Sequence, residues 1–220
     1  MLAPVAAGAY TRGSMAYNTF TLEQLKREFG LVVVEATEVF AEVPPVAVSA
    51  QLRDALAEGA PLAFAISTEK ARSEMIIAPV LMEVRRQRRG TTSLFSGTEF
   101  TVDAARGLSG FCDFLLSRSP EQLTIEAPVV IIVEAKKEDV RAGVPQCIAE
   151  MVAAQIFNGA HERSGEHVYG AVTTGSSWLF MRLEGQRVTI DLTEYFMRDV
   201  ERIVGILIAM TSGQDRVGKS

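Results

Sequence analysis

The hydrophobic residues of the first ninety positions recur mostly at helical spacing. Thr21 and Gln24 are spaced as a capping box, and Ser49 is a second candidate N-cap. Pro79 falls inside the third helical stretch, so we expect a kink near it. These signals predict helices at 21–30, 49–57 and 67–88 and a strand at 31–36.

From residue 92 the pattern changes from helical spacing to alternation with a period of two, which is typical of strands. The run VVIIV at 129–133 is apolar on both faces, as expected of a central strand that is covered on both sides. Gly175-Ser176-Ser177 reads as a tight turn that joins two strands into a hairpin. The predicted elements are strands at 92–102, 109–116, 128–136, 167–174, 178–183 and 188–192, and helices at 144–158 and 195–210.

The last predicted helix, 195–210, is unusually apolar. One face is formed by Phe196, Val200, Ile203, Val204, Leu207 and Met210. Ile206 and Ile208 extend the apolar surface beyond that face, so the helix is expected either to be buried or to lie in an oligomer interface. We therefore expect a homodimer or another homo-oligomer.

The order of the elements predicts an α/β fold with a mixed β-sheet flanked by helices. The chain has 220 residues, of which 48% are hydrophobic and 22% charged, as in an ordinary globular protein. Nothing in the sequence marks a linker, so we expect a flexible leader at 1–20 and one domain at 21–220.

Charge and cysteine content narrow the function. The net charge of −5 disfavours binding to nucleic acid through bulk positive charge, although a local basic site remains compatible with it. Cys112 and Cys147 show no CxxC or Cys/His clustering, which argues against a zinc site and favours reduced thiols in a cytoplasmic protein. No apolar run reaches the roughly 20 residues that span a bilayer, so we expect no membrane association.

The candidate chemistry lies between residues 110 and 158. Asp113 is in a predicted strand, and Glu134 and Lys136 end the most apolar strand of the chain. Because a strand alternates faces and rises about 3.3 Å per residue, Glu134 and Lys136 should project from the same face. Charges at the end of such a strand are costly unless they are paired or bound to metal. A structural ion pair and a catalytic site both fit this pattern.

Asp113, the triplet Glu134-Ala135-Lys136 and the helix that follows resemble the PD-(D/E)XK nuclease superfamily. That superfamily has an Asp on one strand, Glu-x-Lys on the next, and then a helix. The resemblance extends to a Glu on an earlier long helix, here Glu74, and to the later hairpin AVTTGSSWLFMRL. It implies a restriction-endonuclease-like fold, similar to the nuclease domain of type I restriction subunits. The chain departs from the pattern in having Cys112 before the Asp and Glu150 where some members have Tyr.

The resemblance implies Mg²⁺-dependent hydrolysis of DNA phosphodiester bonds, with Mn²⁺ as an expected substitute. Asp113, Glu134 and the Ala135 carbonyl would supply oxygen ligands, which Mg²⁺ prefers, and Glu74 would add another. Lys136 would orient the attacking water and stabilise the developing phosphate charge. Gln146 would position the phosphate or Lys136.

Candidate contacts to the nucleic acid come from basic side chains, namely Lys137 and the run Arg85, Arg86, Arg88 and Arg89. That run also suits a solvated face at the negative end of a helix. RNA remains open as a substrate. Two alternatives remain: a catalytically inactive interaction module of the same fold that self-associates through its C-terminal helix, and a metal-dependent hydrolase with a small substrate.

Overall fold

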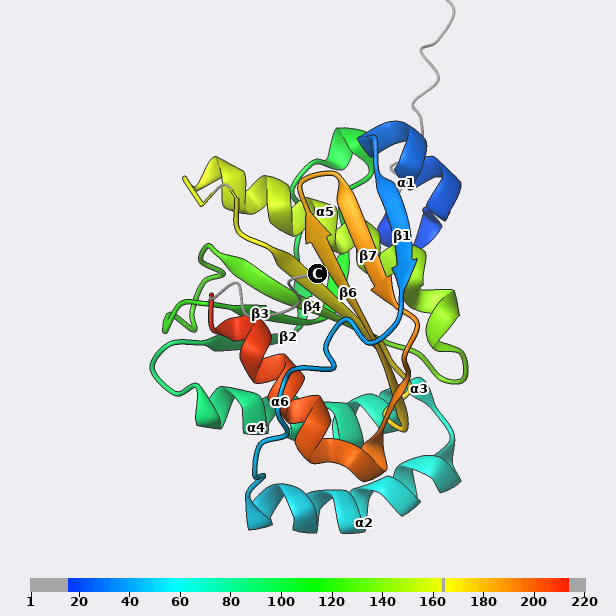
Figure 1. The fold of residues 1–220 in the computed structure, drawn as a ribbon, viewed down its shortest axis with the longest axis vertical. Coiled ribbons are helices and arrows are strands. Elements are labelled where there is room, and N and C mark those ends of the chain that lie inside the picture. The colour runs from blue at the N-terminus through cyan, green and yellow to red at the C-terminus, as the bar shows by residue number, and fades with distance from the viewer. Residues whose placement is uncertain (1–15, 164, 214–220) are drawn as a thin grey trace, which may run out of the picture.

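The computed structural model describes residues 16–163 and 165–213, and these residues form an α/β protein with an open, mixed sheet of eight strands (Figure 1). The strand order is β1-β7-β6-β5-β4-β3-β2, and the short β8 pairs with β6. The β1–β7 and β4–β5 pairs are parallel, and the others are antiparallel. The strands are β1 Val32–Ala36, β2 Ser93–Glu99, β3 Phe111–Ser117, β4 Val129–Ala135, β5 Val168–Thr173, β6 Ser177–Glu184, β7 Arg187–Asp191 and β8 Tyr195–Phe196.

Helices cover both faces of the sheet, and the sheet lies between two hydrophobic cores (Figure 1). Residues of α1 and α5 pack in one core, and residues of α2, α4 and α6 pack in the other. Every residue of β4 is buried, which confirms the expected central strand covered on both sides. The helices are α1 Leu22–Phe29, α2 Ala50–Ile66, α3 Glu69–Arg72, α4 Ala78–Gln87, α5 Val144–Ala160 and α6 Val200–Thr211.

The predicted caps are present, but α2 is longer than expected. Thr21 and Gln24 form the capping box of α1, and the Ser49 side chain accepts a hydrogen bond from the Leu52 N–H. The helix expected to end at Ala57 continues to Ile66 with Pro61 inside it. Core contacts outweigh the helix-breaking tendency of proline, because α2 buries an apolar row on both sides of Pro61. That row is Leu52, Leu56, Ala60 and Ala63.

The helix expected at 67–88 is interrupted. Thr68 caps α3, a π-helical turn follows at Ser73–Ile77, and α4 then begins at Ala78. The irregularity expected near Pro79 is therefore present, as a π-helical turn that ends two residues before it. Pro79 has no N–H to donate to the preceding turn, and a π-helical turn accommodates this locally.

The start of the last helix and the end of the expected leader both need correction. The helix expected at 195–210 begins only at Val200, because β8 pairs with β6 and a 3-10 turn follows it. Most apolar side chains of α6 are buried inside the chain, and Ile208 and Ala209 are half-buried, so the helix follows the first of its two expected placements. The leader expected at 1–20 is also too long, because Tyr17 and Phe20 are buried. Residues 1–15 lie outside the described part.

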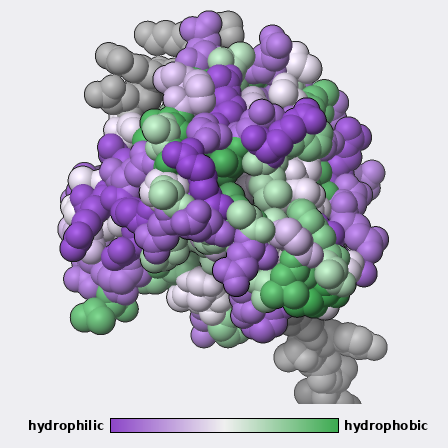
Figure 2. Space-filling view, turned by 90° about the horizontal axis from the view of Figure 1, so that it is seen from below, coloured by the Kyte–Doolittle hydropathy of each residue, from purple (hydrophilic) through white to green (hydrophobic). Residues whose placement is uncertain are grey.

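The surface seen from the side of α2 is largely hydrophilic, with hydrophobic groups in separate patches (Figure 2). Within the described residues, no helix is both long and apolar enough to cross a membrane.

The packing of α6 generates a stability test at Gly205. A Cβ at this position would lie 2.4 Å from the Pro44 carbonyl oxygen, which is backbone and cannot easily move. In a free helix, Gly→Ala stabilises by about 1 kcal/mol. We expect Gly205→Ala instead to lower the free energy of unfolding by about 1–3 kcal/mol through overpacking. Urea denaturation measures this, and a higher midpoint than wild type would contradict the described packing.

Candidate active site

Asp113 and Glu134 meet where β3 and β4 run antiparallel. Asp113 Oδ2 accepts a hydrogen bond of 2.8 Å from the Ala135 N–H, which holds the carboxylate beside the end of β4. Glu134 is 2% exposed and its Oε1 accepts a hydrogen bond from Lys136 Nζ. The two carboxylates and the lysine expected from the sequence are therefore together at one end of the sheet.

The site continues from Lys136 onto α5. Lys136 Nζ donates to Gln146 Oε1 at 3.3 Å, and Gln146 Nε2 donates to Glu150 Oε1 at 3.1 Å. Because the Gln146 amide nitrogen donates to Glu150, its amide oxygen faces Lys136. Gly143 leaves room for the lysine, because a Cβ there would lie 3.0 Å from Lys136 Cε.

Burial and charge set the proton affinities of these groups. Burial raises the pKa of Glu134 to about 8, the negative charge of Asp113 adds to the rise, and the hydrogen bond from Lys136 opposes it. Complete burial, together with the charge of Glu134, holds the pKa of Glu150 well above its usual range. Burial alone would lower the pKa of Lys136, but the hydrogen bond and charge of Glu134 outweigh it and raise that pKa.

Two carboxylate oxygens in this network have no partner. Glu134 Oε2 and Glu150 Oε2 are buried and accept no hydrogen bond from the described residues. A buried oxygen without a donor is costly in a folded protein. For Glu134, which lies beside Asp113, a bound cation or a proton would remove that cost.

Glu74 does not join the site as expected. It is exposed on the π-helical turn and forms an ion pair with Lys70, with Nζ and Oε1 2.8 Å apart. The charge of Glu69, five residues earlier, adds to that of Asp113 in raising the pKa of both Glu134 and Lys136. The interrupted helix explains the error, because the π turn changes the face on which later residues point.

The basic run also lies elsewhere. Arg85 Nε donates to Gln122 in the loop that connects the far ends of β3 and β4, 3.2 Å away. Because five residue steps of β4 separate Val129 from Glu134, that end is roughly 17 Å from Glu134. Arg86 pairs with the buried Glu83, so its role there is structural. Arg88 and Arg89 follow at the same end of α4.

Lys137 does not reach the carboxylates either. Its Nζ pairs with Glu138 Oε1 at 3.0 Å, and both side chains are largely exposed. Among the described residues, no group of three or more His, Cys, Asp or Glu side chains is placed to hold a metal ion. Any metal at this site would therefore have two carboxylates, Asp113 and Glu134, as its protein side-chain ligands.

Glu69 and Arg72 also lie near the site, although local sequence patterns do not directly indicate either residue. The Arg72 guanidinium donates to the Thr174 carbonyl at 2.9 Å, just beyond β5, so it lies at the same end of the sheet as Glu134. The only sequence signal for this placement is Thr68, whose capping of α3 puts the first turn of that helix at the site. The contact between Arg72 and Thr174 joins residues 102 positions apart and has no local pattern.

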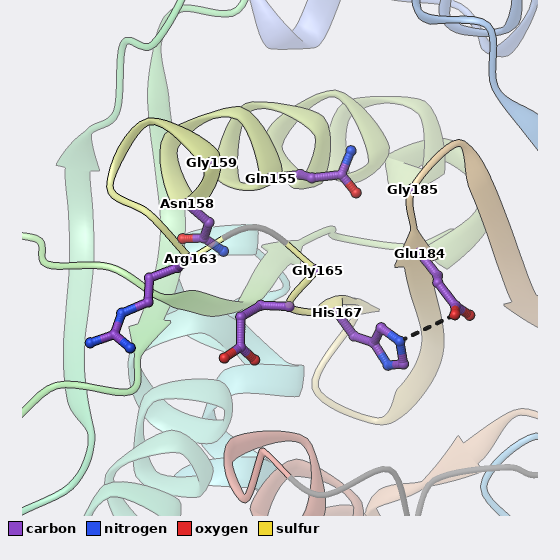
Figure 3. A pocket seen from close by; sticks show the side chains of 9 residues that line it. Gln155, Asn158, Gly159, Arg163, Gly165, His167, Glu184 and Gly185 are labelled. Atoms are coloured by element: carbon purple, nitrogen blue, oxygen red, sulfur yellow. Dashed lines mark ion pairs between the residues drawn. The ribbon is translucent and has the colours of Figure 1, made fainter.

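A cavity of about 370 Å³ lies at the opposite end of the sheet (Figure 3). It is lined by Gln155 and Asn158 near the end of α5 and by His167, which precedes β5 and pairs with Glu184. Since Glu134 lies beside the other end of β5, this cavity is separate from the carboxylate site.

The sequence matches no protein-family model and no curated protein. The function must therefore be argued from the residues of the site.

The raised pKa of Glu134 predicts how stability depends on pH. Folded Glu134 binds its proton more tightly than the unfolded chain does, so its contribution is fully present below pH 4.5 and is lost as the pH rises toward 8. Within this window the slope for one proton approaches about 1.4 kcal/mol per pH unit. Glu134→Gln should flatten the dependence, as measured by urea denaturation from pH 5 to 9. The exposed Glu138→Gln is the control, and an unchanged slope in Glu134→Gln would contradict the described burial.

Proposed function

We propose that this protein is a metal-dependent nuclease of the PD-(D/E)XK type that hydrolyses DNA phosphodiester bonds. The observation that carries the proposal is the buried Glu134 Oε2, which accepts no hydrogen bond within residues 16–163 and 165–213, beside Asp113 and two residues before Lys136. A purely structural ion pair would be expected to satisfy both oxygens of a buried carboxylate. Here one oxygen is paired with the lysine and the other is left free.

The donor set fits Mg²⁺, with Mn²⁺ as a substitute. Asp113, Glu134 and the Ala135 carbonyl would hold the ion, and two carboxylates suit a cation that keeps several of its own waters. When bound, such an ion polarises a phosphodiester oxygen and lowers the pKa of a water. Its charge would also offset the repulsion between the two carboxylates, which contributes to the raised pKa of Glu134. Glu74 is no longer part of the proposed ligand set.

Lys136 is proposed to bind the scissile phosphate and to orient the attacking water. Its side chain is partly buried, and the charge of Glu134 keeps it protonated. An ammonium held in place stabilises charge that develops on the phosphate without reorganising in the reaction. Gln146, itself oriented by Glu150, limits the directions in which Lys136 can point.

The order of the elements supports the finer fold assignment, a restriction-endonuclease-like domain. Antiparallel β3 and β4 carry Asp113 and Glu134, α5 follows, and β5 then lies parallel to β4. The antiparallel β5–β6 hairpin comes next. This is the order that the resemblance implies, and it places α5 over the face from which Glu134 and Lys136 project.

The test of the proposed function is metal-dependent cleavage by wild type and Lys136→Ala. We expect wild type to cut plasmid or single-stranded DNA with Mg²⁺ or Mn²⁺, and Lys136→Ala to lose at least about 100-fold in rate, the scale of one preorganised charge. Lys26→Ala, an exposed lysine on α1, is the matched control and should cut as wild type does. Equal cutting by wild type and Lys136→Ala would refute the assignment.

A second measurement separates metal binding from cleavage. Because a ligand that binds only the folded state stabilises it by mass action, Mg²⁺ at 100 times its Kd should add about 2.7 kcal/mol to the unfolding free energy. The same addition should have little effect on Asp113→Asn, which loses a charged ligand. Equal stabilisation of both proteins would place the metal elsewhere.

A further inference from the structure

Three phenylalanine side chains are exposed in the described part of the chain. They are Phe64, Phe111 and Phe196, with 37%, 66% and 42% of their surface accessible. Exposing an aromatic ring to water costs free energy that burial in the core would avoid. Single exposed apolar residues need no explanation, but a group that shares one location does.

All three rings lie at the end of the sheet that carries the candidate site. Phe111 opens β3 two residues before Asp113, so it lies at the same end of that strand. Phe196 lies in β8 opposite Ser177, the first residue of β6, just past the end of β5. Phe64 lies under the guanidinium of Arg72, which donates to the Thr174 carbonyl after β5.

The rings lie on both sides of the carboxylates. β3 and β6 are three strand spacings apart, or roughly 14 Å, and β4 with Glu134 lies between them. Arginine guanidinium groups stack on two of the rings: Arg72 lies 5.1 Å from the Phe64 centroid and Arg198 lies 5.2 Å from that of Phe196. Each of these pairs offers a flat aromatic face and a cation close together.

The charge at this end does not suit a duplex. Duplex binding depends on neutralising several phosphates with lysine and arginine. Three of the cations here already have carboxylate partners, in the pairs Lys70–Glu74 at 2.8 Å, Lys137–Glu138 at 3.0 Å and Arg198–Asp199 at 3.4 Å, and Arg72 donates to a backbone carbonyl. The basic run that could follow a duplex backbone lies at the other end of the sheet. Stacking on aromatic rings needs unpaired bases but no excess of positive charge.

We propose that the site takes an unpaired polynucleotide strand, whose bases stack on Phe111 on one side of the carboxylates and on Phe64 and Phe196 on the other. This inference rests on the proposed nuclease function and names its substrate class. The strand crosses the end of the sheet and brings one phosphodiester group to Lys136. Base identity matters little, because every base presents a flat π-face to a phenylalanine ring.

Binding is measured by fluorescence anisotropy with a labelled 12-nucleotide strand of mixed sequence and with the same strand annealed to its complement. The full-length Lys136→Ala protein is used with Mg²⁺, so that bound strands are not cut. We expect the single strand to bind at least 10-fold more tightly than the duplex. In the same background, Phe111→Ala and Phe196→Ala should each weaken single-strand binding by about 5- to 150-fold, the equivalent of ~1–3 kcal/mol per stacked base.

The matched control is Leu123→Ala. Leu123 is 93% exposed in the loop at the far end of the sheet, so it tests for a general effect of removing surface apolar area. We expect this variant to bind the single strand as the parent does. Equal or tighter binding of the duplex, unchanged binding by both phenylalanine variants, or no binding of either form would each overturn the inference.

The cleavage assay distinguishes this failure from failure of the nuclease proposal. Cutting of duplex and single strand at equal rates, unaffected by the phenylalanine changes, would leave the nuclease standing and refute the strand preference. If wild type cuts neither form but single-strand binding still depends on the rings, the nuclease proposal is refuted and the strand preference stands. DNA and RNA strands of the same sequence identify the polymer, since stacking serves both and only the 2′-hydroxyl differs.

Discussion

The burial of the Glu134 carboxylate at the end of the most apolar strand is the constraint on which the rest of the site depends. Every residue of β4 is buried, so the carboxylate cannot turn toward water. Lys136 donates a hydrogen bond to one carboxylate oxygen and also contacts Gln146. Gln146 in turn donates to a second buried acid, Glu150. Such a buried pair is not explained by stability alone, because apolar residues of similar volume would stabilise the fold as well or better.

Local patterns predicted much of the fold. The capping box at Thr21, the hairpin turn at Gly175 and the doubly buried strand at 129–133 are each determined by residues close in sequence, and each is present. The errors arose where tertiary contacts overrode the local signal. Core packing carries α2 past Pro61, and pairing with β6 turns Tyr195–Phe196 into a strand. Neither contact has a signature in the neighbouring residues.

Part of the site was likewise predicted from local patterns, and part was not. Asp113, Glu134, Lys136 and Gln146 come together because strand alternation and the start of α5 determine their directions. Glu74 was misplaced because a helix interrupted by a π turn no longer has one face along its whole length, and the arginine run lies far from the site because α4 ends at the other end of the sheet. Glu69 and Arg72 depend on how that helix docks against the end of β5, which one-dimensional spacing cannot specify.

The edge strand β1 has a consequence for how the chain is made. Val32–Ala36 pairs only with β7, and beside this junction the Glu38 N–H bonds to Thr193, 155 positions later. At a synthesis rate of about 5–20 residues per second, the run Val32-Val33-Val34 waits roughly 8–30 seconds for its partner. A β-branched apolar run without a partner is prone to pair with other chains. The nascent chain therefore carries an unpaired, aggregation-prone segment until β7 has been synthesised. Only then can β1 join the edge of the sheet.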